Sequence, residues 1–161
     1  MVELPLPASG RIVGSCHYYA LRVFFEDTDL SGIVYHANYL KYCERARSDL
    51  LDLLDVDQRT AQEAGEGAYA VADAEIAWKR PAKLGDGLVV ETRATSLRAA
   101  SVRMYQRIVR PLAIAPTALE SAEVLAEVNL RIGFVSPDGR PRRQPDAWRA
   151  KFARFAGAEE S

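Results

Sequence analysis

The chain has 161 residues and a formal net charge of −1 at pH 7, and this length suits one domain that buries about 70% of its unfolded surface. A chain so close to neutral has no overall field that attracts nucleic acid or an anionic membrane surface, so we expect neither as a partner. Its two cysteines, Cys16 and Cys43, are too few for a disulfide framework or a clustered metal site.

The N-terminus does not read as a targeting segment. Residues 1–7 lack the basic start and the unbroken apolar core of a signal peptide. No later stretch approaches the roughly 18 consecutive apolar residues of a transmembrane helix. We therefore expect a soluble, cytoplasmic protein without membrane insertion.

Residues 18–25 are rich in aromatic and β-branched side chains and predict a strand. After them the chain places acids at residues 26–29, a glycine at Gly32 and a histidine at His36, just before a helix that begins near Ala37. This strand-to-helix junction is where we expect the chemistry.

The helix is predicted by periodicity. Apolar residues recur at spacings of four and three, the pattern of one buried helical stripe, at Tyr39, Cys43, Ala46, Leu50 and Leu53, whereas Lys41, Arg45, Asp52 and Asp55 fall elsewhere. Cys43 lies on this stripe, so we interpret it as a small core residue rather than a nucleophile. Asp57 is expected to cap a second short helix over residues 58–64.

The remainder predicts strands. Residues 69–78 form a long strand, and residues 88–95 and 102–109 form a hairpin about a turn at residues 98–100. The segment 118–134 is ambiguous, because Glu120, Glu123 and Glu127 fall at helical spacing whereas residues 128–132 favour a strand.

Four blocks stand in a fixed order around the junction. They are residues 26–29 (Glu-Asp-Thr-Asp), 32–36 (Gly-Ile-Val-Tyr-His), 38–40 (Asn-Tyr-Leu) and 44–47 (Glu-Arg-Ala-Arg). Together they resemble the signature of hotdog-fold acyl-CoA thioesterases. They are most similar to the Tol-Pal-associated group, relatives of 4-hydroxybenzoyl-CoA thioesterase.

Further similarity at residues 80–86, in the hairpin and over residues 137–152 extends the resemblance to residues 18–152. It implies an α+β hotdog domain in which an antiparallel sheet wraps a long central helix, with segment 118–134 as a strand. The expected division is an N-terminal extension over residues 1–17, one domain over residues 18–155 and a tail over residues 156–161.

Thioester hydrolysis needs a nucleophile or activated water and hydrogen-bond donors for the developing oxyanion. The resemblance implies that Asp29 is the nucleophile or general base, and that N–H groups from Val34 to His36 face the thioester oxygen at the positive end of the helix dipole. His36 would contact the thioester, orient Asp29 or protonate the leaving thiolate. The alternatives are a turn or capping role for Asp29 and a His36 ring paired with a backbone carbonyl.

Other residues are expected to support the site. Gly32 would permit close approach or a positive φ, and Tyr35 and Asn38 would shape the acyl pocket or stabilise the turn. Ser101 is a supporting candidate from the hairpin. The expected contacts to coenzyme A (CoA) phosphates are Lys79, Arg80, Lys83, Arg98 and Arg103, although solvent-facing arginines need no ligand to explain them.

Glu44 and Arg47 are three apart on the helix and predict an ordinary surface ion pair. The basic residues 140–143 are either a phosphate contact or a solvated loop. We expect no metal and no cofactor.

The substrate implied by the resemblance is a thioester of CoA or of acyl carrier protein, with a short, medium or aromatic acyl group. The resemblance also implies a homo-oligomer, a dimer or tetramer with sites at the subunit boundary. The alternative is a non-catalytic partner of acyl carrier protein or of envelope lipids with the same fold, and a hotdog dehydratase fits the motif less well.

Overall fold

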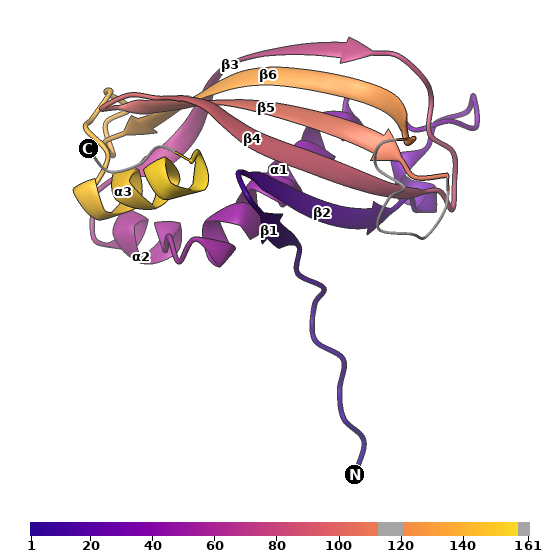
Figure 1. The fold of residues 1–161 in the computed structure, drawn as a ribbon, viewed down its shortest axis with the longest axis horizontal. Helices are drawn as coiled ribbons and strands as arrows, with labels where there is room; N and C mark the ends of the chain where they lie inside the picture. Colours follow the sequence, from indigo (N-terminus) through magenta and orange to yellow (C-terminus); the bar gives the residue numbers. More distant parts are fainter. Residues whose placement is uncertain (113–120, 158–161) are drawn as a thin grey trace.

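The computed structural model describes residues 1–112 and 121–157. A six-stranded antiparallel sheet curves over one long helix (Figure 1). The strand order is β1-β2-β4-β5-β6-β3. The strands are β1 (Arg11–Val13), β2 (Cys16–Arg22), β3 (Ala68–Trp78), β4 (Gly87–Leu97), β5 (Ser101–Arg110) and β6 (Glu123–Val135).

The helices are a 3-10 turn η1 (Phe25–Asp27), the long α1 (Asn38–Leu53), the short α2 (Gln58–Glu63) and α3 (Asp146–Phe155). Helix α1 runs beneath the concave face of the sheet, with α2 and α3 gathered toward one end (Figure 1). The expected α+β fold, with an antiparallel sheet and a central helix, is confirmed. No helix in residues 1–112 or 121–157 is long and apolar enough to cross a membrane.

Helix α1 forms because its apolar stripe meets the sheet. Tyr39, Cys43, Ala46 and Leu50 are at most 2% exposed, as their spacing predicts. Leu53 was expected to share this burial, and that prediction was wrong: it is the last residue of α1 and stays 40% exposed. The buried stripe therefore ends one turn earlier.

Cys43 is a core residue, as expected. Its side chain belongs to the central hydrophobic cluster, and burial raises the pKa of its thiol to about 12. The thiol therefore stays protonated at neutral pH and is a poor nucleophile.

The local predictions for α2 and for the hairpin are confirmed. The Asp57 side chain accepts a hydrogen bond from the Thr60 N–H at 3.0 Å and caps α2. The β4–β5 hairpin closes with a 2.8 Å bond from the Arg98 N–H to the Ser101 carbonyl.

The ambiguous segment is a strand over Glu123–Val135, and residues 118–120 lie outside the described part of the chain. Val128, Leu130, Ile132 and Phe134 alternate into the core, a period of two that only a strand presents to one face. Pairing with β5 and β3 on its two sides outweighs the helix propensity of its glutamates and alanines.

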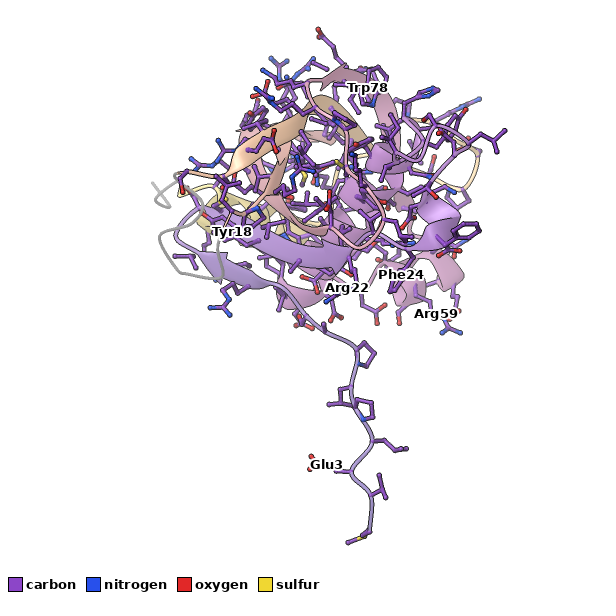
Figure 2. The ribbon with its side chains drawn as sticks, turned by 90° about the vertical axis from the view of Figure 1, so that its right-hand side faces the viewer. Glu3, Tyr18, Arg22, Phe24, Arg59 and Trp78 are labelled. Atoms are coloured by element: carbon purple, nitrogen blue, oxygen red, sulfur yellow. The ribbon has the colours of Figure 1, made fainter. Side chains whose placement is uncertain are left out.

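The sheet begins inside the region assigned to the N-terminal extension. Strand β1 and the start of β2 fall within residues 11–17, and His17 is fully buried with its Nε2 at 2.6 Å from an Asp49 carboxylate oxygen on α1. The Gly10 N–H donates to the same carboxylate at 3.0 Å. The segment before Ser9, including Glu3, projects away from the body (Figure 2).

The two edges of the sheet differ. β1 is a three-residue edge strand, but β3 is eleven residues long and, among the described residues, pairs with β6 alone. Val71 and Trp78 on β3 are 48% and 49% exposed. The long open edge of β3 is the kind of surface that proteins normally cover.

Candidate active site

The loop between η1 and α1 is a tight turn locked by backbone hydrogen bonds. The Asp29 N–H donates to the Ile33 carbonyl, and the Gly32 N–H donates to the Asp29 carbonyl, both at 3.0 Å. Gly32 adopts φ +80°, and a Cβ there would meet no atom within 4 Å. Gly32 is therefore needed for its backbone conformation, and not for a close approach.

Asp27 ties this loop to the start of the helix. Its carboxylate accepts from the Phe24 N–H at 2.7 Å. Its carbonyl accepts from the Tyr35 N–H and from the Asn38 side-chain amide, each at 2.9 Å. Asp27 and Asn38 are 6% and 8% exposed, so their hydrogen bonds fix the turn from its buried side.

Asp29 presents a carboxylate to solvent at the tip of the loop. The hydroxyl and the N–H of Ser31 both donate to its Oδ1 and hold the pKa of the carboxyl below its usual value, and His36 acts in the same direction. Within the described residues no donor contacts the second oxygen, Oδ2. The side chain is thus both a turn aspartate and an ionised carboxylate with one free oxygen.

His36 lies in an aromatic cluster at the start of α1. Its ring centroid is 4.4 Å from that of Tyr35 and 5.6 Å from that of Trp78, and the Trp78 indole N–H donates to the His36 carbonyl at 3.0 Å. Throughout residues 1–112 and 121–157 no hydrogen bond of the His36 ring is found, including one that the ring N–H would donate to a backbone carbonyl. Sequence reasoning missed Trp78, whose only signal was a large aromatic at a strand end.

The backbone N–H groups of this region divide into occupied and free donors. The Val34 N–H donates to the Ala82 carbonyl and the Tyr35 N–H to the Asp27 carbonyl, both at 2.9 Å. The N–H groups of His36 and Ala37 have no acceptor in the described part of the chain. Since α1 begins at Asn38 after the N-cap Ala37, the free donors lie at the positive end of the helix dipole.

The basic residues expected to contact CoA fall into two groups. Lys79 pairs with Glu127 at 2.7 Å and Arg80 with Glu123 at 3.2 Å, and Lys83 lies beside the loop through its backbone bridge to Ile33. The second group, Arg98, Arg103 and Ser101, lies at the hairpin end of the sheet. Ser101 is therefore not assembled with Asp29 of the same chain.

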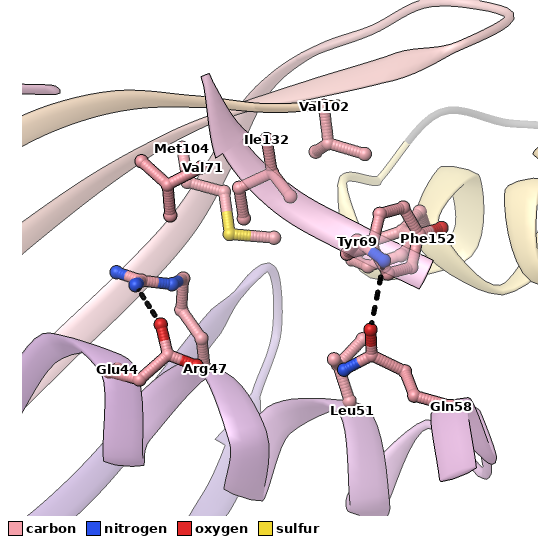
Figure 3. Close-up of a pocket in the computed structure, with 10 residues that line it drawn as sticks. All are labelled: Glu44, Arg47, Leu51, Gln58, Tyr69, Val71, Val102, Met104, Ile132 and Phe152. Atoms are coloured by element: carbon pink, nitrogen blue, oxygen red, sulfur yellow. Dashed lines mark hydrogen bonds and ion pairs between the residues drawn. The ribbon is translucent and has the colours of Figure 1, made fainter. Parts of the chain in front are cut away.

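A cavity of about 80 Å³ lies between the second half of α1 and the sheet (Figure 3). Its lining is mostly apolar, with Glu44, Arg47 and Gln58 as polar members. Glu44 and Arg47 form the expected ion pair, but Arg47 is only 8% exposed and donates to the Gln106 side-chain oxygen at 2.7 Å. The pair thus reaches from the surface into the core.

Two further expectations concern ligands. Arg142 and Arg143 of the basic loop contact the Glu66 carbonyl and Asp146, so these guanidinium groups already have protein partners. Among the described residues no group of three or more His, Cys, Asp or Glu side chains could hold a metal ion.

Comparison with known proteins places this geometry in a family. The model of the thioesterase-like superfamily matches residues 23–154. The acyl-CoA thioesterase YbgC of Haemophilus influenzae is 40% identical over 92 residues, which are 57% of this chain and 68% of that protein.

Solved structures agree. A probable thioesterase from Bartonella henselae is 32% identical, with a TM-score of 0.68 over 81% of this chain and 98% of that one. A 4-hydroxybenzoyl-CoA thioesterase solved with 4-hydroxybenzoyl-CoA is 20% identical and shares the fold, with a TM-score of 0.70 over 83% and 96% of the two chains. The chain therefore belongs to the thioesterase-like superfamily, has its hotdog fold and is a thioester hydrolase.

Proposed function

We propose that the protein hydrolyses acyl-CoA thioesters with short, medium or aromatic acyl groups to the free acid and CoA, with Asp29 at the reaction centre. One observation carries this proposal. An ionised carboxylate stands on the same hydrogen-bonded turn as the N–H groups of His36 and Ala37 at the start of a long helix, and neither its Oδ2 nor these two N–H groups have a partner among the described residues. A nucleophile or base beside preplaced oxyanion donors is what acyl transfer requires.

In the proposed reaction the thioester oxygen accepts hydrogen bonds from the His36 and Ala37 N–H groups. The free oxygen of Asp29 either attacks the carbonyl carbon to give a mixed anhydride, which water then opens, or removes a proton from the attacking water. In both routes the carbon–sulfur bond breaks and the thiolate takes up a proton. The exposed His36 ring is the donor in reach of that sulfur.

The apolar surface beside this loop supports the proposal that the site also binds the acyl group of the substrate. Tyr35, Leu40 and Trp78 are large side chains that stay 46%, 39% and 49% exposed next to the free donors. They would contact the acyl chain or ring, and an aromatic acyl group would stack on the ring cluster of Tyr35, His36 and Trp78.

We further propose that the protein acts as a homo-oligomer built on a dimer through β3. A two-fold axis across the open β3 edge would pair two copies and cover Val71 and Trp78. It would also exclude water from Asp29, which is exposed in the single chain, and so strengthen the electrostatics of the site. A tetramer would form from two such dimers.

We also propose that the protein belongs to the Tol-Pal-associated group of thioesterases and acts in the cytoplasm. The group assignment is supported by the four motif blocks, which include His36. The location is supported by the free, buried thiols of Cys16 and Cys43, which suit a reducing compartment.

The competing function is a non-catalytic partner of acyl carrier protein or envelope lipids. The bond between Ser31 and Asp29 favours it, because a carboxylate that caps its own turn needs no catalytic role.

Thiol release from a panel of short, medium, long and aromatic acyl-CoA esters, with acyl carrier protein thioesters alongside, separates the two functions. We expect turnover on at least one ester and its loss in Asp29→Asn. A folded wild-type protein without turnover on any ester would establish the binding function instead.

A further inference from the structure

Trp78, the last residue of β3, contacts the start of α1 through the polar edge of its side chain. Its indole N–H donates to the His36 carbonyl at 3.0 Å, across 42 residues of sequence. Its ring also meets the His36 ring edge to face, with the centroids 5.6 Å apart. In the described part of the chain no main-chain N–H donates to this carbonyl. A side chain from the sheet therefore satisfies it.

The His36 carbonyl and the Ala37 N–H belong to one peptide group. A peptide group is planar and trans, so its C=O and N–H bonds point in opposite directions. A hydrogen bond that holds the oxygen therefore also fixes the direction of the Ala37 N–H, which has no acceptor within residues 1–112 and 121–157. The same bond polarises the peptide group and makes its N–H a stronger donor.

The other free donor is held in a different way. The His36 N–H shares its peptide group with the Tyr35 carbonyl, and this carbonyl accepts from the Asn38 N–H at 2.9 Å. The direction of the His36 N–H is thus set by a main-chain bond inside the turn. The direction of the Ala37 N–H depends instead on the indole of Trp78, which comes from a distant strand.

The end of β3 is a firm support for this contact. β3 pairs with β6 up to Trp78, and directly after it the Lys79 N–H donates to the Leu125 carbonyl at 2.8 Å. Four residues beyond Trp78, the Ala82 carbonyl accepts from the Val34 N–H at 2.9 Å. The segment that carries the indole is therefore tied to the sheet on one side and to the Asp29 loop on the other.

We propose that Trp78 is a positioning residue of the oxyanion site, whose indole N–H holds the peptide group between His36 and Ala37 so that the Ala37 N–H faces the thioester oxygen. This inference rests on the proposed function. As the carbonyl carbon becomes tetrahedral, its oxygen gains negative charge, and a donor that is already aimed stabilises it without reorganisation. The ground-state carbonyl gains less, so Trp78 acts mainly on the rate of the chemical step.

Kinetics of the full-length protein are the first test. Trp78→Phe keeps an aromatic ring and loses the N–H. Its kcat on the preferred acyl-CoA should fall about tenfold to a hundredfold, less than the loss of a whole oxyanion donor, while KM stays close to that of wild type. Urea unfolding and sedimentation velocity check that stability and oligomeric state are kept.

Trp148→Phe is the matched control, because it removes the other indole of the chain. Trp148 lies on α3 and packs on Tyr69 and Phe134, so this variant should keep the kcat of wild type. Wild-type kcat in Trp78→Phe, an equal loss in Trp148→Phe, or a change in Trp78→Phe that is confined to KM would overturn the proposal.

A spectroscopic test needs no turnover. In an uncleavable CoA ketone, a CH2 group replaces the thioester sulfur and the carbonyl oxygen is kept. Hydrogen bonds to that oxygen lower the infrared stretching frequency of the isotope-labelled carbonyl. With the ketone bound at saturation, the frequency should be lower in wild type and in Trp148→Phe than in Trp78→Phe.

The outcomes separate the role of Trp78 from the proposed function. The expected frequency difference without any hydrolysis by wild type would refute the proposed function and keep Trp78 as the residue that aims the donor. Hydrolysis by wild type with the same carbonyl frequency in Trp78→Phe would refute the role of Trp78. A folded wild-type protein that neither hydrolyses acyl-CoA nor binds the ketone would refute both.

Discussion

At the scale of the residue, the Asp29 carboxylate is kept ionised by its neighbour. Ser31 donates two hydrogen bonds to it and lowers its pKa, so the fraction of active, deprotonated Asp29 should fall only in acid below the usual titration range of an aspartate. Ser31→Ala removes the hydroxyl, and the acid limb of the kcat/KM profile should move to higher pH. The profile is measured by thiol release at constant ionic strength, and an unmoved limb would mean that Asp29 is not the group that titrates.

Gly32 tests the shape of the same turn. At φ +80° any residue with a Cβ is strained, so Gly32→Ala should lower the free energy of unfolding by about 1–2 kcal/mol and reduce turnover with it. Gly87→Ala is the matched control, because a Cβ there meets no atom within 4 Å and Gly87 has no positive φ. Urea unfolding measures the free energy of unfolding of both variants. Equal stability of Gly32→Ala and Gly87→Ala would contradict the requirement for a left-handed backbone conformation at residue 32.

The sequence allowed much of this loop to be anticipated, because acids, glycine and histidine cluster within eleven residues of the chain. Trp78 could not be anticipated, since it comes from a strand some forty residues later and reaches His36 only through the fold. The pairing of the Val34 N–H could not be anticipated either. This group was expected to face the thioester oxygen, but it donates to the Ala82 carbonyl. Which backbone N–H groups are free to bind a ligand depends on tertiary hydrogen bonds, and local sequence patterns do not predict these.

At the scale of the element, α1 holds the site by packing its stripe on the sheet. Leu50 is fully buried and Leu53 is 40% exposed. Leu50→Ala should therefore cost about 2–5 kcal/mol of unfolding free energy, as for other core leucines, and Leu53→Ala less than about 1 kcal/mol. Both are read from urea midpoints with a common slope. Similar losses in the two variants would show that the stripe continues through the last turn.

The residue pattern alone predicted some elements, whereas it missed β1 and left β6 ambiguous until the family resemblance favoured a strand. α1 and the β4–β5 hairpin carry patterns of 3.6 and 2, with turn residues between. β1 has three exposed residues and no alternation, so it is visible only through its pairing with β2. β6 contains helix-forming residues and becomes a strand because β3 and β5 pair with both of its edges.

At the scale of the whole molecule, the proposed dimer would cover the open β3 edge and would also exclude water from the Asp29 loop. A lysine at Val71, which is 48% exposed on β3, would place a charge in the proposed dimer contact. Val71→Lys should shift the protein toward monomer and lower turnover in parallel, as measured by sedimentation velocity and thiol release.

Val13→Lys on the opposite edge strand, where the side chain is 59% exposed, is the matched control and should change neither property. Full activity of a monomeric Val71→Lys variant would contradict a site that needs two chains.

The strand order also explains why the basic residues could not be grouped from the sequence. β3, which precedes β4 in the chain, lies at the far edge beside β6, so Asp73 and Arg131 become neighbours across 58 residues. Lys79 and Arg80 form ion pairs at one end of the sheet, and Arg98 and Arg103, at the other end, have no ion pair within residues 1–112 and 121–157. Only the topology separates these two groups.

The central claim is that Asp29 carries thioester hydrolysis, and the matched pair Asp29→Asn and Asp57→Asn tests it most directly. Both aspartates are exposed and accept from a neighbouring N–H and hydroxyl, and both have a lowered pKa. Of the two, Asp29 is the one on the loop whose His36 and Ala37 N–H groups, just before α1, have no acceptor among the described residues. With kcat measured on the preferred acyl-CoA and oligomeric state checked, Asp29→Asn should lose at least about a hundredfold in rate, while Asp57→Asn retains wild-type turnover. Equal activity of the two variants would contradict the account.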